Sequence, residues 1–292
     1  MKIDALLVHQ LISSQFPDLA NLPLRQILPG GWDNRTFRLG DQMSVRLPSH
    51  ASYSFQVHQE HDWLPKLAAH LSLPIPTPLR MGKPEFNYPF SWSIYSWIEG
   101  ESLDQSSLLS QTQFALDLAE FLGSLHRVSS RGGPVPGSHN FYRGALLSVY
   151  NSETREALLK LSDVVDVDAL TRVWDMAVSS EWEGSPLWVH GDISVGNLLV
   201  KDGRLSAVID FGLLAVGDPA CDLVIAWNFL NPESRKVFRD RLTFHSGIDD
   251  QTWNRAKGWA LWKALIVLAK SSPSSPIINE TRRILNSILT DF

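Results

Sequence analysis

Two neighbouring stretches of the chain decide its fold: Val189-His190-Gly191-Asp192-Ile193-Ser194-Val195-Gly196-Asn197-Leu198-Leu199-Val200 and, shortly afterwards, Val208-Ile209-Asp210-Phe211-Gly212. The apolar pairs Leu198-Leu199 and Val208-Ile209 lie on either side of Asp202-Gly203, a dipeptide typical of tight hairpin turns. The pattern predicts a β-hairpin that carries Asp210 back beside Asn197.

The polar residues of these stretches are those that phosphoryl transfer from a magnesium-bound nucleotide to a hydroxyl group requires. A carboxylate must accept the hydroxyl proton, and a second carboxylate and an amide oxygen must hold the metal. Asp192 is the predicted catalytic base, and Asn197 and Asp210 are the predicted Mg²⁺ ligands. His190 is counted with the catalytic loop, but it precedes the base by only two residues and is expected to brace the loop. The set predicts a kinase that acts on a small molecule.

Two other interpretations of the same stretches are weaker. His190, Asp192 and Ser194 lie too close together in sequence to converge as a nucleophilic triad, and the chain contains no Gly-x-Ser-x-Gly elbow. A surface loop with a few polar residues would explain any one position alone. It does not explain His, Gly, Asp and Asn followed in order by Ile-Asp-Phe-Gly across a hairpin.

The composition is that of an ordinary soluble enzyme. The 292 residues are 44% hydrophobic and 20% charged, which suffices for one large domain or two lobes. No apolar run is long enough to span a bilayer, and the N-terminus lacks a signal-peptide pattern. The single cysteine, Cys221, excludes an internal disulfide. These features predict a cytoplasmic protein without a membrane partner, and they say nothing about its oligomeric state.

The distribution of charge is more informative than the net value of −5. Residues 1–100 hold eight Lys or Arg and eight Asp or Glu, whereas residues 101–292 hold 18 and 23. The whole negative excess therefore lies in the part that carries the catalytic stretch. An acidic surface there would attract a cationic acceptor, and it argues against nucleic acid as a partner.

The first hundred residues have the pattern of a β-rich unit. A short helix is expected over residues 4–12 and a longer one over residues 55–71, while the proline-rich residues 73–78 must be extended. Strands are expected at Leu24–Leu28, Thr36–Leu39, Ser44–Leu47 and Phe90–Trp97, with turns of glycine and proline between the first three.

The remaining residues are mostly helical in pattern. Expected helices cover residues 113–127, 152–161, 166–179, 219–229, 232–243, 250–270 and 276–290. The predicted fold class is α+β, with a small β-rich N-terminal lobe over residues 1–98 and a larger, mostly helical C-terminal lobe over residues 99–292.

A nucleotide is expected in the cleft between these lobes, because ligand sites favour such interfaces. The turn over residues 29–35 would cover the phosphates, a cation in the third strand would face them with an acidic partner on the next helix, and the end of the last strand would hold a purine through its backbone. The residues expected to bind nucleotide are Gly30, Gly31, Asn34, Arg46, Glu60, Ser96 and Ile98. The glycine turn is a weak signal, since it matches neither Gly-x-Gly-x-x-Gly nor a Walker sequence.

The chain resembles the aminoglycoside phosphotransferase family in three motifs: His190-Gly191-Asp192 with Asn197, Ile209-Asp210-Phe211-Gly212, and Gly217-Asp218-Pro219-Ala220-Cys221-Asp222-Leu223. The resemblance implies a protein-kinase-like bilobal fold, Asp192 as base, Asn197 and Asp210 as Mg²⁺ ligands, and ATP or GTP as co-substrate. It also implies Arg46 as the phosphate-binding cation with Glu60 as its partner. Asp218 and Asp222 are expected to brace the segment after the metal aspartate.

Two residues depart from related patterns. Arg46 stands where the better-studied antibiotic kinases of the family have lysine, so the contact geometry must differ. Gly191 stands where most protein kinases have an arginine that senses a phosphorylated activation loop, which argues against a protein substrate.

The acceptor is the least determined part of the prediction. An aminoglycoside-like cation is the first expectation, and a macrolide or a choline-like or homoserine-like metabolite is the alternative. Contacts with the acceptor are expected from residues 139–143 and 227–262, where Trp259 and Trp262 either line a pocket or belong to the core. A non-catalytic nucleotide-binding module also stays open, because of Arg46 and the weak glycine turn.

Overall fold

The computed structural model describes residues 2–28, 30–31, 33–272 and 275–291. A five-stranded antiparallel sheet forms the N-terminal lobe, with the strand order β1-β2-β3-β5-β4. Its elements are α1 (Ala5–Gln15), η1 (Pro17–Leu19), β1 (Leu24–Gln26), β2 (Asn34–Leu39), β3 (Met43–Pro48), η2 (Ala51–Tyr53), α2 (Ser54–Ala68), β4 (Pro78–Gly82) and β5 (Trp92–Ser96).

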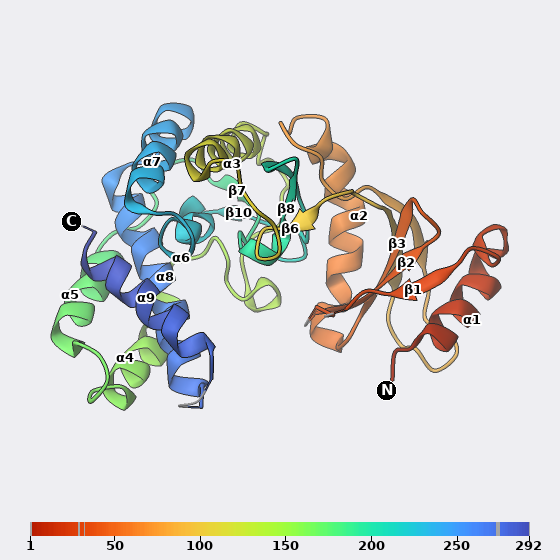
Figure 1. Ribbon diagram of the computed structural model, residues 1–292, viewed down its shortest axis with the longest axis horizontal. Coiled ribbons are helices and arrows are strands. Elements are labelled where there is room, and N and C mark those ends of the chain that lie inside the picture. The colour runs from red at the N-terminus through yellow and green to blue at the C-terminus, as the bar shows by residue number, and fades with distance from the viewer. Residues whose placement is uncertain (1, 29, 32, 273–274, 292) are drawn as a thin grey trace.

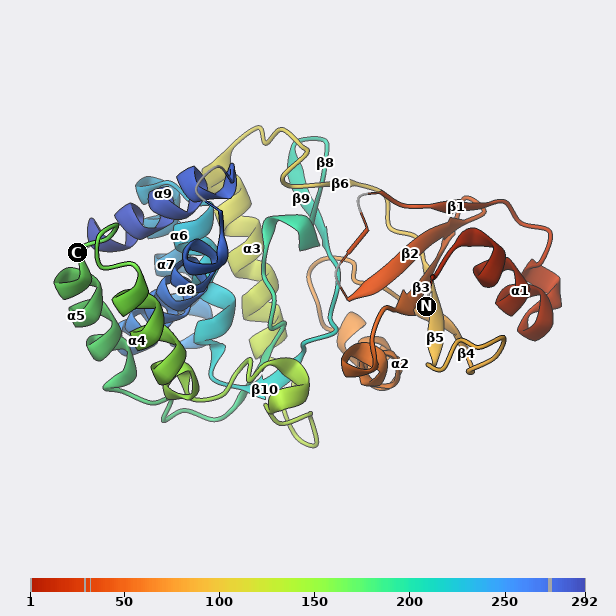
Figure 2. The ribbon, with the colours of Figure 1, turned by 90° about the horizontal axis from the view of Figure 1, so that it is seen from below.

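The sheet follows from alternating apolar residues. Phe37 and Leu39 on β2 and Val45 and Leu47 on β3 are buried, and Phe37 pairs directly with Val45. Helix α1 closes the small core of this sheet, whereas α2 lies on the side that faces the helical lobe (Figures 1 and 2). The C-terminal end of α2 packs in the larger hydrophobic core, which belongs to the helical lobe. Helix α2 therefore contacts both lobes.

The C-terminal lobe is mostly helical, with short strands at its contact with the sheet (Figure 1). Its helices are α3 (Gln111–His126), α4 (Asn151–Lys160), α5 (Val167–Val178), α6 (Ile225–Asn228), α7 (Pro232–Ser246), α8 (Asp250–Lys270) and α9 (Ile277–Leu289). Its strands are β6 (Glu101–Ser102), β7 (Leu187–Val189), β8 (Leu198–Lys201), β9 (Arg204–Val208) and β10 (Ala215–Gly217), and its 3₁₀ helices are η3 (Ser138–Asn140), η4 (Leu147–Tyr150), η5 (Val195–Asn197) and η6 (Pro219–Val224).

The predicted hairpin is confirmed. Strands β8 and β9 pair with Leu198 opposite Val208, and the connection turns at Asp202 and Gly203. Both turn residues have positive φ, +53° and +75°, which is the backbone that an Asp-Gly dipeptide adopts most readily in a two-residue turn. The loops at the open end of this hairpin are therefore held by local sequence.

The fold class is confirmed as α+β with two lobes, while one local prediction differs from the structure and several short strands were not predicted. The continuous helix expected over residues 219–229 is wrong, since the first six residues form the 3₁₀ helix η6 and only Ile225–Asn228 is α-helical. The tighter turn brings Asp222 to the backbone of the catalytic loop. The short strands β4, β6, β7 and β10 were not predicted. The division of the lobes at residues 98 and 99 stays a prediction.

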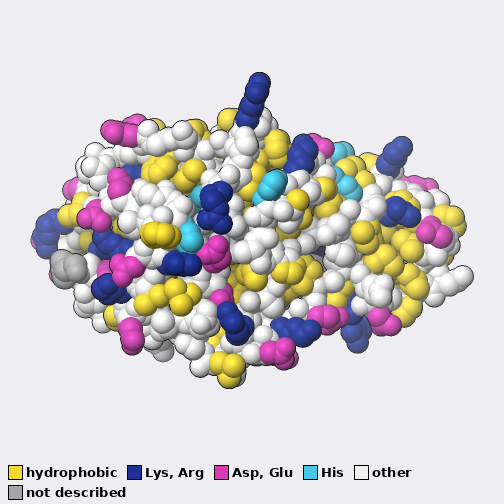
Figure 3. Space-filling view, turned by 90° about the horizontal axis from the view of Figure 1, so that it is seen from above, with side chains coloured by type: hydrophobic (Ala, Val, Ile, Leu, Met, Phe, Trp, Pro, Cys, Tyr) yellow, Lys and Arg dark blue, Asp and Glu magenta, His cyan; other side chains and the backbone are white. Residues whose placement is uncertain are grey.

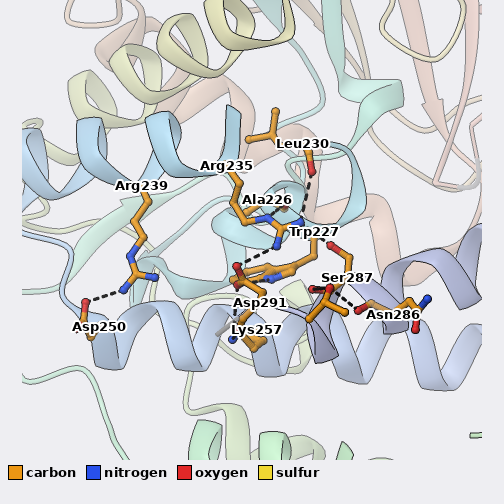
Figure 4. Close-up of polar contacts among 11 residues, drawn as sticks. Ala226, Trp227, Leu230, Arg235, Arg239, Asp250, Lys257, Asn286, Ser287 and Asp291 are labelled. Atoms are coloured by element: carbon orange, nitrogen blue, oxygen red, sulfur yellow. Dashed lines mark hydrogen bonds and ion pairs between the residues drawn. The ribbon is translucent and has the colours of Figure 1, made fainter. Parts of the chain in front are cut away.

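A partly buried polar cluster connects the segment after α9 to the helical lobe (Figure 4). We call it the C-terminal clasp: Trp227, Arg235, Lys257 and Asp291. Asp291 accepts a hydrogen bond from Trp227 Nε1 at 2.9 Å and pairs with Arg235 at 3.1 Å and Lys257 at 3.5 Å. Burial by itself raises the pKa of Asp291, but the charges of Lys257 and Arg235 outweigh it and lower the pKa. The clasp holds α9 against α6, α7 and α8.

The face of the molecule drawn in Figure 3 carries charges of both signs. On the face drawn in Figure 3, Lys and Arg side chains are interspersed with Asp and Glu. Across the part of the chain that the structure describes, no helix combines the length and the apolar character needed to cross a membrane.

Candidate active site

The catalytic loop between β7 and β8 is held by a buried histidine. His190 is fully buried, and its Nδ1 accepts the backbone N–H of Asp192 at 3.1 Å. Its Nε2 lies 3.0 Å from the carbonyl oxygen of Ile209, so Nε2 carries the proton that completes this second hydrogen bond. His190 thus connects the loop of Asp192 to the strand that precedes Asp210, in agreement with its expected bracing role.

A buried carboxylate holds the same loop from behind. Asp222, on η6, accepts the backbone N–H groups of His190 at 2.7 Å and Gly191 at 2.8 Å. Gly191 has a φ of +86°, and a Cβ there would lie 2.4 Å from the carbonyl oxygen of Leu213. A glycine is therefore required at this position for two independent reasons.

Asn197 and Asp192 face one another across the loop. Asn197 Nδ2 donates to Asp192 Oδ2 at 2.9 Å and to the Asp192 carbonyl oxygen at 3.0 Å. The amide oxygen of Asn197 is thereby left for another ligand. The backbone N–H of Ile209 donates to the Asn197 carbonyl at 2.9 Å, which fixes the spacing between Asn197 and Asp210.

The carboxylate of Asp192 is kept ionised by its neighbours. Burial alone raises the pKa of this group, but nearby charges, with Lys263 foremost and Arg143 among them, outweigh burial and lower the pKa. Lys263 Nζ lies 3.4 Å from Asp192 Oδ1. An ionised carboxylate in this position can accept a proton from a bound hydroxyl group.

Arg46 joins the two lobes at the floor of the cleft. One of its guanidinium nitrogens lies 3.2 Å from Glu60 Oε1, and the other lies 2.5 Å from Asp210 Oδ1. The Tyr95 hydroxyl donates to the second oxygen of Glu60. Glu60 is only 2% exposed, and burial raises its pKa while Arg46 partly offsets the rise. The ion pair expected between Arg46 and Glu60 is present, and Arg46 reaches the predicted metal ligand as well.

A cavity of about 200 Å³ opens between the sheet and the catalytic hairpin. Most of the residues expected to bind nucleotide lie in or beside it: Gly31, Asn34, Arg46, Ser96 and Ile98 line it, and Glu60 lies behind Arg46. The predicted metal ligands Asn197 and Asp210 line it as well. Gly30 is placed on the outer surface beside Gln26, Leu28 and Arg35 instead of among the described residues that line the cavity. Pro29 and Trp32, which belong to the same predicted turn, lie outside the described residues.

Three charged residues near the site were not singled out by the sequence, although Asp33 belongs to the expected turn and Arg143 to a segment expected to contact the acceptor. Asp33 lines the cavity, accepts from Gln56 Nε2 at 3.2 Å, and has its pKa raised by burial and by the charge of Asp210. Lys263 and Arg143 line a second, smaller pocket beside Asp192. Asp33 lies within the predicted glycine turn, which was a usable signal, whereas nothing in the sequence connects Lys263 with Asp192.

The oxygen atoms at the end of the hairpin fit a magnesium ion. Asp210 supplies a half-exposed carboxylate and Asn197 an amide oxygen, and hard oxygen ligands are those that Mg²⁺ prefers. Within the described residues there is no group of three or more His, Cys, Asp or Glu that could hold a metal without other ligands. Such a pair suits an ion that takes its remaining ligands from phosphates and water.

The two lobes, the cleft between them and the loop of Asp192 and Asn197 define a protein with the protein-kinase-like bilobal fold. The chain belongs to the phosphotransferase enzyme family, whose model matches residues 25–259.

Similar proteins agree with this assignment. An aminoglycoside 3'-phosphotransferase from Escherichia coli is 30% identical over 142 residues, which are 47% of this chain and 51% of the relative. The chain thus matches about half the length of this curated relative.

Two solved structures share the fold over nearly the whole chain. The GDP and kanamycin complex of APH(2")-IIia superposes with a TM-score of 0.73 at 19% identity, covering 98% of this chain and 100% of the other. The macrolide 2'-phosphotransferase MphH from Brachybacterium faecium gives a TM-score of 0.63 at 19% identity, covering 95% and 97%.

Proposed function

We propose that this protein is a magnesium-dependent kinase that transfers the γ-phosphoryl group of ATP or GTP to a hydroxyl group of a small molecule. The observation that carries the proposal is the loop in which Asn197 holds Asp192 while Asp210 lies at the end of the same hairpin, below a cavity between two lobes. Phosphoryl transfer needs positioning and charge neutralisation more than covalent chemistry, and these residues supply both.

In this mechanism Asp192 accepts the proton of the acceptor hydroxyl as its oxygen attacks the γ-phosphorus. Asn197 restrains the Asp192 carboxylate, and His190 and Asp222 hold the loop that carries it. Arg46 directs positive charge toward the phosphates and is itself oriented by Glu60. Asn197 and Asp210 would hold Mg²⁺, which neutralises phosphate charge when it is bound.

The nucleotide would lie with its base at the end of β5, where Ser96 and Ile98 line the cavity, and its phosphates toward Arg46. The GDP bound in one structural neighbour supports a nucleoside triphosphate as donor, without deciding between ATP and GTP. Aminoglycoside-like molecules are the first candidates for the acceptor, because the named relatives act on them, and macrolides are the alternative.

The test is release of nucleoside diphosphate by the purified protein with Mg²⁺ and ATP or GTP, against a panel of hydroxylated antibiotics and metabolites. Asp192→Asn serves as the blank, and it should lose roughly 10²–10⁴ in rate, the value of a positioned base. Nucleotide binding with no acceptor-dependent release on the whole panel would instead indicate a non-catalytic nucleotide-binding module.

A further inference from the structure

A second pocket, separate from the nucleotide cavity, is lined by Asp192 and so adjoins the predicted base. Its walls come from the catalytic loop, from η6, from helix α8 and from the segment after η3. The lining residues are Arg143, Gly191, Asp192, Ile193, Cys221, Val224, Trp259, Trp262 and Lys263. The enclosed part measures about 10 Å³, which is room for roughly one group of the size of a water molecule. The enclosed space is therefore too small for a whole acceptor, and only one small group of a bound molecule could enter it, with the rest of that molecule outside.

Two cations flank the base in this pocket. Lys263 lies 3.4 Å from Asp192 and is 39% exposed at its side chain, so its ammonium group also faces the pocket. Among the described residues Asp192 is the only hydrogen-bond partner of its ammonium group, which has three N–H donors. Two of its donors are thus available to a bound molecule.

Arg143 is held in place by aromatic rings and not by an acid. Its guanidinium carbon lies 5.1 Å from the ring centroids of both Trp259 and Trp262, and Tyr150 stacks on Trp262 with centroids 3.8 Å apart. Among the described residues, the Arg143 side chain has neither a hydrogen-bond acceptor nor an ion-pair partner. A half-buried guanidinium in this state presents its planar fork of donors to whatever enters the pocket.

The neighbouring acids are already engaged. Asp222 is occupied by the backbone N–H groups of the catalytic loop. Glu153, at the outer edge, accepts from Trp262 Nε1 at 2.8 Å and pairs with Lys270 at 3.5 Å. The lining residues themselves comprise two cations and one carboxylate, so the pocket carries an excess of one positive charge. The net negative charge of the whole lobe does not extend into it.

We propose that the acceptor is a compact hydroxy acid, whose carboxylate is bound by Arg143 and Lys263 while its hydroxyl group lies at Asp192. This inference rests on the proposed kinase function and puts an anionic acceptor in place of the aminoglycoside-like candidates considered for it. A guanidinium fork beside an ammonium group is the arrangement that recognises a carboxylate, with hydrogen bonds strengthened by charge on both partners. A polycationic acceptor would instead place its ammonium groups against Arg143 and Lys263, where like charges repel.

The chemical step is balanced without any further reagent. The hydroxyl oxygen of the acid forms a bond to the γ-phosphorus of the nucleotide, and the bond between that phosphorus and the β–γ bridging oxygen breaks. Nucleoside diphosphate leaves, and the hydroxyl proton passes to Asp192. The product is a phosphomonoester of the hydroxy acid.

The experiment compares acceptors that differ in charge, and each acid is matched in shape by its own primary amide. Nucleoside diphosphate release is measured with hydroxy acids of three to six carbons, with the primary amide of each acid, and with amino alcohols, phosphorylated alcohols and an aminoglycoside. At least one acid should be used at least tenfold better than its amide, as judged by kcat/KM. An acceptor that is used equally well as amide, amine or phosphate would overturn the inference.

Two variants then assign the effect to the pocket. Arg143→Gln and Lys263→Gln should each raise KM for the acid by about 10- to 100-fold, the value of a hydrogen bond to a charged group, and leave KM for the nucleotide unchanged. Arg143→Lys keeps the positive charge but lacks the planar fork of donors. Its KM for the acid should lie between those of Arg143→Gln and the natural protein. Lys236 lies on α7, and its side chain is 75% exposed. Lys236→Gln is therefore the matched control and should leave the KM values for acid and nucleotide unchanged.

The outcomes separate this inference from the function on which it rests. Release with cationic acceptors that is lost in Asp192→Asn but unchanged in Arg143→Gln would reject the hydroxy acid and keep the kinase. Absence of release with acceptors of every charge, with nucleotide binding intact, would reject both. Thermal melting of each variant checks that a lost preference does not reflect unfolding.

Discussion

Replacing Arg46 by methionine should destabilise the protein strongly, because it leaves Glu60 buried without its cation. Glu60 is 2% exposed, and its remaining hydrogen-bond partner would be the Tyr95 hydroxyl. Removing one member of a buried ion pair costs about 3–5 kcal/mol. Since each kcal/mol shifts the melting temperature of a chain of this size by roughly 2–4 °C, we expect Arg46→Met to melt well below the natural protein. Urea unfolding measures the free energy directly.

The pH dependence of this loss provides a second check. Burial raises the pKa of Glu60, and in Arg46→Met the offset from the arginine disappears, so the folded state holds a proton that the unfolded state releases. A folded pKa above the unfolded one makes stability rise as the pH falls through it. The free energy of unfolding that Arg46→Met loses relative to the natural protein should therefore be largest near pH 8 and smaller near pH 5.

A double variant isolates the pair. Adding Glu60→Gln to Arg46→Met removes the unpaired charge, so the double variant should be more stable than Arg46→Met alone. The reasoning would be refuted if Arg46→Met lost less than about 1 kcal/mol and lost it equally at pH 5 and pH 8.

Three further substitutions test contacts that support the catalytic loop and the helical lobe. Gly191→Ala should lose about 2 kcal/mol or more in urea unfolding, because its φ of +86° and the nearby Leu213 carbonyl leave no room for a Cβ; an unchanged midpoint would contradict this geometry. Arg255→Met leaves Asp218 unpaired at 5% exposure and should cost about 3–5 kcal/mol, part of which Asp218→Asn should restore. Asp291→Asn should weaken the C-terminal clasp by about 1–3 kcal/mol near pH 6. Because the pKa of Asp291 is lowered on folding, its contribution is present above the unfolded value of 3.8 and fades as the pH falls through the folded one; a deficit that persists near pH 2 would argue against the clasp.

Local sequence was sufficient to predict the hairpin and the loop that it supports. The Asp-Gly turn and the apolar pairs around it fix the pairing of Leu198 with Val208, and that pairing determines where Asn197 and Asp210 lie. The strand pattern placed Arg46 in β3, and the helix expected after that strand placed Glu60 where it could pair with Arg46. Such predictions succeed because the residues involved lie within one or two neighbouring elements.

Contacts between distant segments were beyond the reach of the sequence. Lys263 approaches Asp192 across 71 positions, and in the same pocket the Arg143 guanidinium lies beside the rings of Trp259 and Trp262 on α8. The two tryptophans are 2% and 5% exposed and also line the pocket, so both of the roles considered for them apply. The net charge of the lobe predicted an acidic acceptor surface, whereas the pocket beside Asp192 has an excess of cations, since charge at a site depends on which side chains converge there.

The most direct measurement of the central claim is ³¹P NMR of the reaction mixture with Mg²⁺, nucleoside triphosphate and an accepted hydroxyl compound. The proposed mechanism predicts a phosphomonoester signal that grows in step with nucleoside diphosphate in the natural protein and is nearly absent in Asp192→Asn. Free phosphate in place of the ester, or an ester formed equally fast by Asp192→Asn, would contradict transfer to a hydroxyl group through Asp192.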